Sequence, residues 1–558
     1  MHFPFRLSCT LLLSLFVTVS TSAQSSDDAK QCRANNLPPD SVISHCTAAI
    51  ESGELSGAFL AAAFCHRGIA YDNRGDDESA IKDYEQAIEI KPDYAAAFFY
   101  RGLADDHKGN YDSGIQDFDR AIRLKPDYVD AFINQGFAYA QKGDYDRAIQ
   151  DFDQAIELKP DSDGAFSNRG LAYAYKGDPD QAIQDFNQAI ALKPDLAGYF
   201  NNRGLAYIHK GDCDRAIQDF DRAIELEPDY AEAFGDRATA YNQKGDHNRA
   251  LPDYDQAILL KPTLVTAFDG RGNAYRAKGD YDQAIKDYSE VIRLKPGDAS
   301  AFNNRGAVYG VKGNLDRAIQ DYDEAISLEP NYALAFDNRG FIYFQKGEYD
   351  RAIQDFDRAI WLKPDFAQAL INRSGVYSLR ADYERALHDS EEAIRLRPDD
   401  PEVLRSRGFY HFFLAQFEAA QQDFALSLGK KRTDAYAAIW LYLAGTRNGK
   451  QVSGELERNA AALDLKAWPG PVVNLYLGKI SSQALLRTAR DLDPEKDKQK
   501  RCEANFYLGE DALLRGQKDN AIRFFQDSLA TGVTTLSEYE GARAELKRMH
   551  AGTNSSRQ

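Results

Sequence analysis

Six asparagines recur in the sequence with a spacing that makes them candidates for peptide binding. Neighbouring members differ in position by 34 or a multiple of 34, and they are Asn134, Asn168, Asn202, Asn304, Asn338 and Asn372. An asparagine side chain carries both a hydrogen-bond donor and an acceptor, so a row of asparagines can bind the backbone of an extended peptide without selecting its sequence. The row is interrupted where Asp236 and Gly270 replace asparagine. This break divides the predicted peptide-binding row into an earlier and a later half.

The same period defines the elements that position these side chains. Prolines recur with this spacing, at positions 92, 126, 160, 194, 228, 262, 296, 330, 364 and 398. A representative unit, 127–160, reads "DYVDAFINQGFAYAQKGDYDRAIQDFDQAIELKP" and predicts amphipathic helices over about 128–142 and 145–158. The Lys-Gly-Asp between them ends the first helix with glycine and caps the second with aspartate. Two helices within this period are typical of the tetratricopeptide repeat (TPR).

In a TPR superhelix the first helices line the concave side, so we expect the six asparagines to face that groove. The arrangement resembles the asparagine ladders with which some long TPR superhelices bind peptides. Asparagine is also common at this position in repeats of every function. Two interpretations therefore stay open, a peptide-binding ladder and a mere repeat consensus.

The remaining recurrent positions predict packing and scaffolding. Glycine recurs on the first helix and alanine on the second, with phenylalanines between them, as in Gly136, Ala155 and Phe152. An arginine precedes the small residue, and an aspartate follows at a constant interval, as in the pair of Arg169 and Asp185. The arginines are Arg101, Arg169, Arg203, Arg237, Arg271, Arg305, Arg339 and Arg373. Their aspartate companions favour structural ion pairs over an anion-binding site.

No pattern in the chain indicates catalysis. The nine histidines are scattered, and the glycines of the array lie on first helices or in turns between helices rather than in a phosphate-binding loop. We therefore predict that the protein is not an enzyme, with no catalytic residue, no metal site and no cofactor.

The net charge of the chain indicates which class of partner it can bind. The chain has 68 Lys and Arg against 86 Asp and Glu, a net charge of -18. This balance repels phosphate backbones, so we expect protein or peptide clients and no nucleic acid. Beyond the N-terminal segment 1–23 no apolar run is long enough to predict a transmembrane span.

That N-terminal segment predicts an export signal. It combines Arg6, a short apolar core and small residues before Gln24, which favours a cleaved signal peptide ending at Ala23 over a membrane anchor. In the oxidising compartment that export implies, we expect a disulfide between Cys32 and Cys46, with Cys46 and Cys65 as the alternative pairing.

These patterns predict an all-α fold, a right-handed superhelical solenoid of about eleven TPR helix pairs with helical caps at both ends. A signal peptide (1–23) precedes an N-terminal cap with a partial repeat (24–58). Ten TPR units (59–398) and an eleventh, degenerate unit (399–432) follow. An irregular helical region (433–501), a TPR-like cap (502–550) and a disordered tail (551–558) complete the chain.

The C-terminal region carries a more specific resemblance. "AIWLYLAG", "WPGPVVNLYLGKIS", "CEANFYLGEDALLRGQKDNAIRFFQDSLATGV" and "EYEGARAEL" follow one another between Ala435 and Leu546. In order and spacing this region resembles that of the NlpI-like family of bacterial envelope TPR proteins. The resemblance implies a non-catalytic adaptor that binds envelope proteases and peptidoglycan hydrolases. Founding members are lipoproteins with few repeats, whereas this chain has eleven units and no evident acylation site.

We therefore expect a periplasmic scaffold without a lipid anchor, binding clients in a concave TPR groove. The alternative is a structural TPR subunit of an envelope polysaccharide or secretion assembly. The sequence leaves the oligomeric state undetermined.

Overall fold

The computed structural model describes residues 27–34 and 36–555, with side chains to His550, and the predicted all-α class is confirmed there: no strand occurs among these residues. The predicted signal peptide (1–23) lies outside them. The chain divides into two compact units, 1–287 and 288–558.

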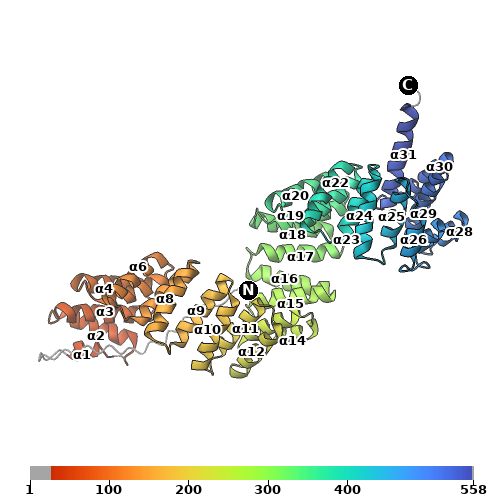
Figure 1. Cartoon of the computed structure of the whole chain (residues 1–558). Coiled ribbons are helices and arrows are strands. Elements are labelled where there is room, and N and C mark those ends of the chain that lie inside the picture. Colours follow the sequence, from red (N-terminus) through yellow and green to blue (C-terminus); the bar gives the residue numbers. More distant parts are fainter. Residues whose placement is uncertain (1–26, 35, 556–558) are drawn as a thin grey trace. The chain divides into compact units, whose positions relative to one another are not determined.

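In unit 1, two short N-terminal helices, α1 (Asp27–Gln31) and α2 (Pro39–Glu51), precede the helix pairs (Figure 1). The first helices of the pairs are α3 (Gly57–Asn73), α5 (Ala95–His107), α7 (Val129–Gln141), α9 (Asp163–Lys176), α11 (Ala197–His209), α13 (Ala231–Gln243) and α15 (Val265–Lys278). The second helices are α4 (Asp77–Ile90), α6 (Tyr111–Leu124), α8 (Tyr145–Leu158), α10 (Pro179–Leu192), α12 (Cys213–Leu226) and α14 (His247–Leu260). The boundary between the units falls inside α16 (Tyr281–Leu294).

Unit 2 continues the pattern and then departs from it. Its paired helices are α17 (Ala299–Val311), α18 (Leu315–Leu328), α19 (Ala333–Gln345), α20 (Tyr349–Leu362), α21 (Ala367–Leu379), α22 (Tyr383–Leu396), α23 (Pro401–Phe413) and α24 (Phe417–Lys430). The C-terminal helices are α25 (Ala435–Arg447), α26 (Ser453–Ala460), α27 (Gly470–Tyr476), α28 (Ser482–Thr488), α29 (Pro494–Leu514), α30 (Lys518–Leu529) and α31 (Ser537–Ser555). Of the predicted disordered tail (551–558), residues up to Ser555 continue α31, and 556–558 lie outside the described residues.

The glycine and the aspartate in the turn between two helices explain how each pair forms. Gly143, after α7, has a φ of +79°, a left-handed conformation in which glycine carries no steric penalty. The Asp144 carboxylate then accepts a hydrogen bond from the backbone N–H of Arg147 and caps α8.

Glycine on the first helix allows the predicted close packing. A Cβ added at Gly136 would lie 2.8 Å from Cε1 of Phe152, closer than packed carbon atoms approach one another. Phe152 and Ala155 are fully buried against that helix. The expected glycine, alanine and aromatic core is thus confirmed.

At the N-terminal end, the disulfide between Cys32 and Cys46 is confirmed, and it ties the segment after α1 to α2. The alternative pairing is wrong, because Cys65 on α3 is a buried free thiol. Burial raises the pKa of that thiol to about 12, which keeps it protonated and unreactive.

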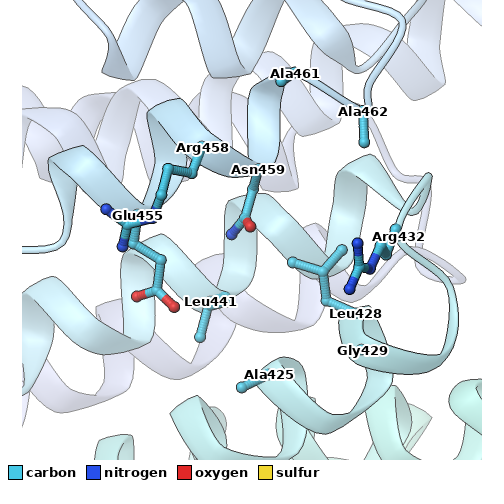
Figure 2. Close-up of a pocket in the computed structure, with 10 residues that line it drawn as sticks. All are labelled: Ala425, Leu428, Gly429, Arg432, Leu441, Glu455, Arg458, Asn459, Ala461 and Ala462. Atoms are coloured by element: carbon cyan, nitrogen blue, oxygen red, sulfur yellow. The ribbon is translucent and has the colours of Figure 1, made fainter.

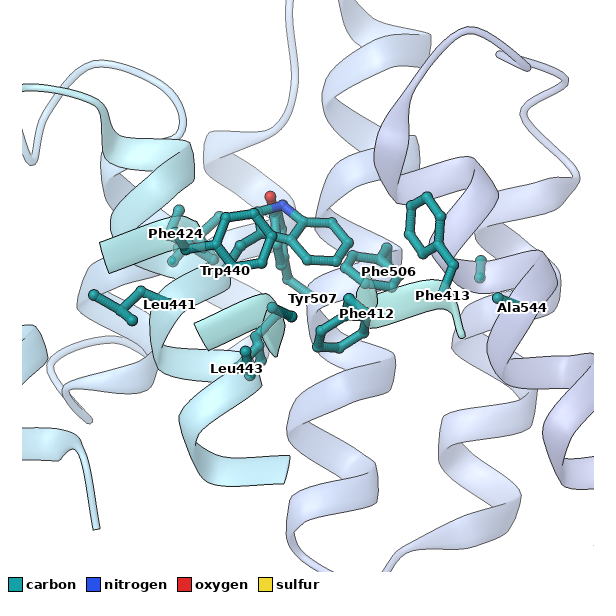
Figure 3. Packing of buried hydrophobic residues seen from close by; sticks show 14 of the residues in the cluster. Phe412, Phe413, Phe424, Trp440, Leu441, Leu443, Phe506, Tyr507 and Ala544 are labelled. Atoms are coloured by element: carbon teal, nitrogen blue, oxygen red, sulfur yellow. The ribbon is translucent and has the colours of Figure 1, made fainter. Parts of the chain in front are cut away.

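The C-terminal region has a core of its own around Trp440 of α25. Its indole is fully buried and packs against Phe412, Phe506 and Tyr507 from α23 and α29 (Figure 3). The centroids of the Trp440 and Phe506 rings lie 5.0 Å apart. Helices from the last repeat and from the irregular region therefore share one hydrophobic core.

Candidate peptide-binding surface

The recurrent arginines form the predicted ion pairs within each repeat. In each of these pairs, Nε and Nη2 donate to the carboxylate 16 residues later, for Arg101, Arg169, Arg203, Arg237, Arg271, Arg305, Arg339 and Arg373. At Arg237 these distances to Asp253 are both 2.7 Å, and Nη1 lies 2.6 Å from Asp221 of the preceding repeat. Burial lowers the pKa of Arg237, but the hydrogen bonds to the two carboxylates outweigh burial and raise it. These guanidinium groups are scaffolding, as predicted.

The six ladder asparagines lie on first helices, three in unit 1 (α7, α9, α11) and three in unit 2 (α17, α19, α21). Their exposure differs. Asn134 and Asn202 are buried, whereas Asn168, Asn304, Asn338 and Asn372 are half-buried. The amide of Asn134 also donates to the backbone carbonyl of Asp130, 2.7 Å away. Asn134 and Asn202 thus present little surface to a ligand.

Several ladder positions connect adjacent repeats, which the sequence reasoning missed. Nδ2 of Asn338 donates to Oδ1 of Asn303, and Nδ2 of Asn372 donates to Oδ1 of Asp337, both at 2.9 Å. At the break in the ladder, Asp236 accepts from Nδ2 of Asn201 at 3.1 Å, and burial raises the pKa of Asp236 to about 7. Each partner is 35 residues earlier, one position before the ladder residue of the preceding repeat. The Asn or Asp at that neighbouring position was the available sequence signal.

Asn168 of α9 differs from the ladder residues that contact the preceding repeat. Its half-buried side chain makes no hydrogen bond to any other described residue. Both the donor and the acceptor of this amide are therefore available to a ligand.

A pocket of about 280 Å³, with aromatic and polar residues in its lining, lies at the C-terminal end of the later half of the ladder. Phe344 of α19, Leu379 of α21 and Phe409 and Phe413 of α23 line it, together with the turn before α31. Helix α31 packs against α23, and Nη1 and Nη2 of Arg543 on α31 both donate to the Leu379 carbonyl at 3.3 Å. The C-terminal helix thus limits the surface of the first helices beyond α21.

One group of side chains in the described chain has the donor types of a metal site. Ligand atoms of Asp72, Asp77 and His107 lie within 4.8 Å of one another. Nδ1 of His107 is 3.3 Å from Oδ1 of Asp72, and this hydrogen bond raises the pKa of His107. The imidazole is half-exposed. This ion pair between helices accounts for the contact, and we assign no metal to it.

Comparison with known families identifies the repeats. A family described as "TPR repeat" matches residues 107–143, 136–177 and 272–310. Two families described as "Tetratricopeptide repeat" match residues 61–94, 165–196, 299–332 and 335–366, and residues 201–263. The chain is therefore a tetratricopeptide repeat protein, a class that generally serves as a non-catalytic protein-interaction scaffold.

Solved structures of other repeat proteins are similar at low sequence identity. A tetratricopeptide repeat protein from Parabacteroides merdae is 22% identical, with 42% of this chain and 93% of that chain covered and a TM-score of 0.36. Yeast Tom70 is 16% identical, with 72% and 98% covered and a TM-score of 0.39. Cut9-Hcn1 of the APC/C is 14% identical, with 73% and 93% covered and a TM-score of 0.39. We draw no functional conclusion from similarity at this level.

None of the helices in 27–34 and 36–555 is both long and apolar enough to cross a membrane.

Proposed function

We propose that this protein is an adaptor that binds extended segments of client proteins along the first helices of its repeats. The observation that carries the proposal is the ladder of half-buried asparagines, above all Asn168, whose amide has no partner in the described chain. Such an amide can donate to and accept from a peptide backbone. The inter-repeat hydrogen bonds of Asn338 and Asn372 hold two further amides in place before a client arrives.

We further propose that the adaptor acts in the bacterial periplasm and brings envelope proteases and peptidoglycan hydrolases together. The disulfide between Cys32 and Cys46 supports an oxidising compartment. The resemblance of residues 435–546 to the NlpI-like family supports this choice of clients.

The decisive experiment compares two asparagine variants in a pull-down from periplasmic extract. Asn168→Ala removes an available amide from a first helix. Asn248→Ala removes an exposed asparagine from second helix α14, where it accepts from Lys278. We expect Asn168→Ala to reduce client recovery several-fold and Asn248→Ala to leave it unchanged. Equal recovery with both variants would assign the ladder to repeat consensus alone.

The identity of the recovered proteins separates the adaptor from the structural alternative. Recovery of proteases or cell-wall hydrolases supports the adaptor. Recovery of polysaccharide synthase or secretion subunits would instead favour a structural subunit of such an assembly.

A further inference from the structure

The irregular C-terminal region contains a pocket that the asparagine ladder does not explain. It has a volume of about 470 Å³ and lies between α24, α25 and α26 of unit 2. Figure 2 shows Leu428, Leu441 and Asn459 between the side chains of Glu455 and Arg432. Leu428 and Leu441 are buried, so the floor is apolar.

Two arginines beside this floor differ from those of the repeats. Arg432 and Arg458 are exposed, and neither makes an ion pair or side-chain hydrogen bond with another described residue. They lie on opposite sides of the pocket (Figure 2). By contrast, Arg237 and its counterparts in the repeats donate hydrogen bonds to aspartates. The donors of Arg432 and Arg458 are free for an external anion.

The surrounding region has the opposite charge to the protein as a whole. Residues 430–501 contain fourteen Lys and Arg against eight Asp and Glu, a net charge of +6, in a chain whose total is -18. At physiological ionic strength charges are screened over about 8 Å, so a ligand responds most to the charges that line the pocket, where Arg432 and Arg458 outnumber the single carboxylate of Glu455. The pocket is therefore complementary to an acidic partner.

We propose that this pocket binds an acidic segment of a partner protein, with an apolar residue placed between two carboxylates. The apolar side chain contacts Leu428 and Leu441, and the carboxylates pair with Arg432 and Arg458. The Asn459 amide, half-buried between them, donates to or accepts from the segment's backbone. This second interaction surface goes beyond the proposed function and does not depend on the ladder.

The test uses a short fluorescein-labelled peptide that carries Glu-Leu-Glu between Gly-Ser flanks, with binding to the full chain followed by fluorescence anisotropy. Because a charge-assisted hydrogen bond contributes about tenfold in affinity, we expect Arg432→Gln and Arg458→Gln each to weaken binding by about that factor. Glu455→Gln removes the carboxylate that lines the pocket, so it strengthens binding. Arg487→Gln is the matched control, an exposed arginine of α28 in the same basic region but outside the pocket. It should change binding less than twofold.

The following results would overturn the proposal. Equal weakening by Arg487→Gln would mean that diffuse charge, not the pocket, attracts the peptide. Unchanged affinity when Gly replaces the central Leu of the peptide, with displacement by inorganic phosphate, would indicate a general anion site. Loss of this binding in Asn168→Ala would place the peptide on the ladder. If the pocket variants have no effect, the pocket proposal fails but the ladder proposal still stands, because its own test uses Asn168→Ala and client recovery.

Discussion

Buried carboxylates with different hydrogen-bond partners distinguish the repeat ion pairs from the aromatic core of the C-terminal region. In the repeats, a carboxylate such as Asp185 is paired with an arginine, whose Nη2 lies 2.6 Å away. In the C-terminal region the buried carboxylates of Glu503 and Glu538 accept from neutral donors. Trp468 and Tyr436 donate to Glu503 at 2.8 and 2.9 Å, and Trp440 and Tyr507 donate to Glu538.

This difference has a physical consequence for each region. An arginine partner keeps a buried aspartate ionised at neutral pH, so the repeat pairs act as fixed electrostatic links. Neutral donors stabilise an ionised glutamate less, and burial raises the pKa of Glu503 to about 8. The carboxyl of Glu503 should therefore respond to pH more than the arginine-paired aspartates of the repeats do.

The largest expected effect comes from removing the aromatic centre of the C-terminal core. Trp440→Ala should cost unit 2 about 3–5 kcal/mol, because the fully buried indole leaves a cavity behind. Trp361→Ala is the control, since that indole is 68% exposed on α20. Its cost should stay within about 0.5 kcal/mol. Hydrogen exchange of α25 and α29 measures both, and similar protection in the two variants would contradict the shared core.

Breaking one repeat ion pair should cost less. Asp185→Ala leaves the half-buried guanidinium of Arg169 without its main partner, and we expect a loss of about 2–3 kcal/mol in α9 and α10. Asp146→Ala breaks an exposed pair with Lys176 and should leave the stability essentially unchanged. Hydrogen exchange again compares the two. A small loss for Asp185→Ala would show that the repeats do not depend on their ion pairs.

The response to pH follows from the raised pKa of Glu503. The folded state holds the Glu503 proton more tightly than the unfolded state, so stability is greatest below about pH 4.5 and falls as pH rises towards 8. We expect the stability of the C-terminal region to fall steadily across this window. Other charged groups that face the carboxyl, Glu538 and Lys500, act on it in opposite directions.

Glu503→Gln tests this response by keeping a neutral side chain in the same space. Denaturant unfolding of the variant, followed by tryptophan fluorescence between pH 5 and 9, should show a shallower fall in stability. Part of the fall remains, because burial raises the pKa of Glu510 and of Glu540 to about 7. An unchanged slope would mean that Glu503 is not the titrating group.

Contacts that recur every repeat could be predicted from the sequence, whereas most contacts made once could not, with the disulfide between Cys32 and Cys46 as the exception. The predicted helix over 145–158 is α8, and the arginine pairs follow from a constant separation of 16 residues. Trp440 and Glu538 are 98 residues apart, and no second copy of that pair exists to reveal the spacing. The free amide of Asn168 was equally hidden, because the ladder asparagines look alike in sequence but have different neighbours in the fold.

The smallest expected effect on stability distinguishes a ladder asparagine that bonds to the preceding repeat from one that does not. Asn372→Ala removes the N–H that Asp337 accepts, and it should cost about 1 kcal/mol because the buried carboxylate loses a donor. Burial raises the pKa of Asp337 to about 6, and without the amide it should rise further. Asn168→Ala removes no internal hydrogen bond, so its stability should change by less than about 0.5 kcal/mol.

Thermal unfolding of both variants at pH 7 and pH 5 tests this contrast. The lost donor stabilises the ionised Asp337, so the deficit of Asn372→Ala should shrink at the lower pH, where that carboxyl is protonated in both proteins. A deficit independent of pH would mean that Asn372 stabilises the repeats through packing or through the hydrogen bond that its Oδ1 accepts from Gln368, and not through Asp337.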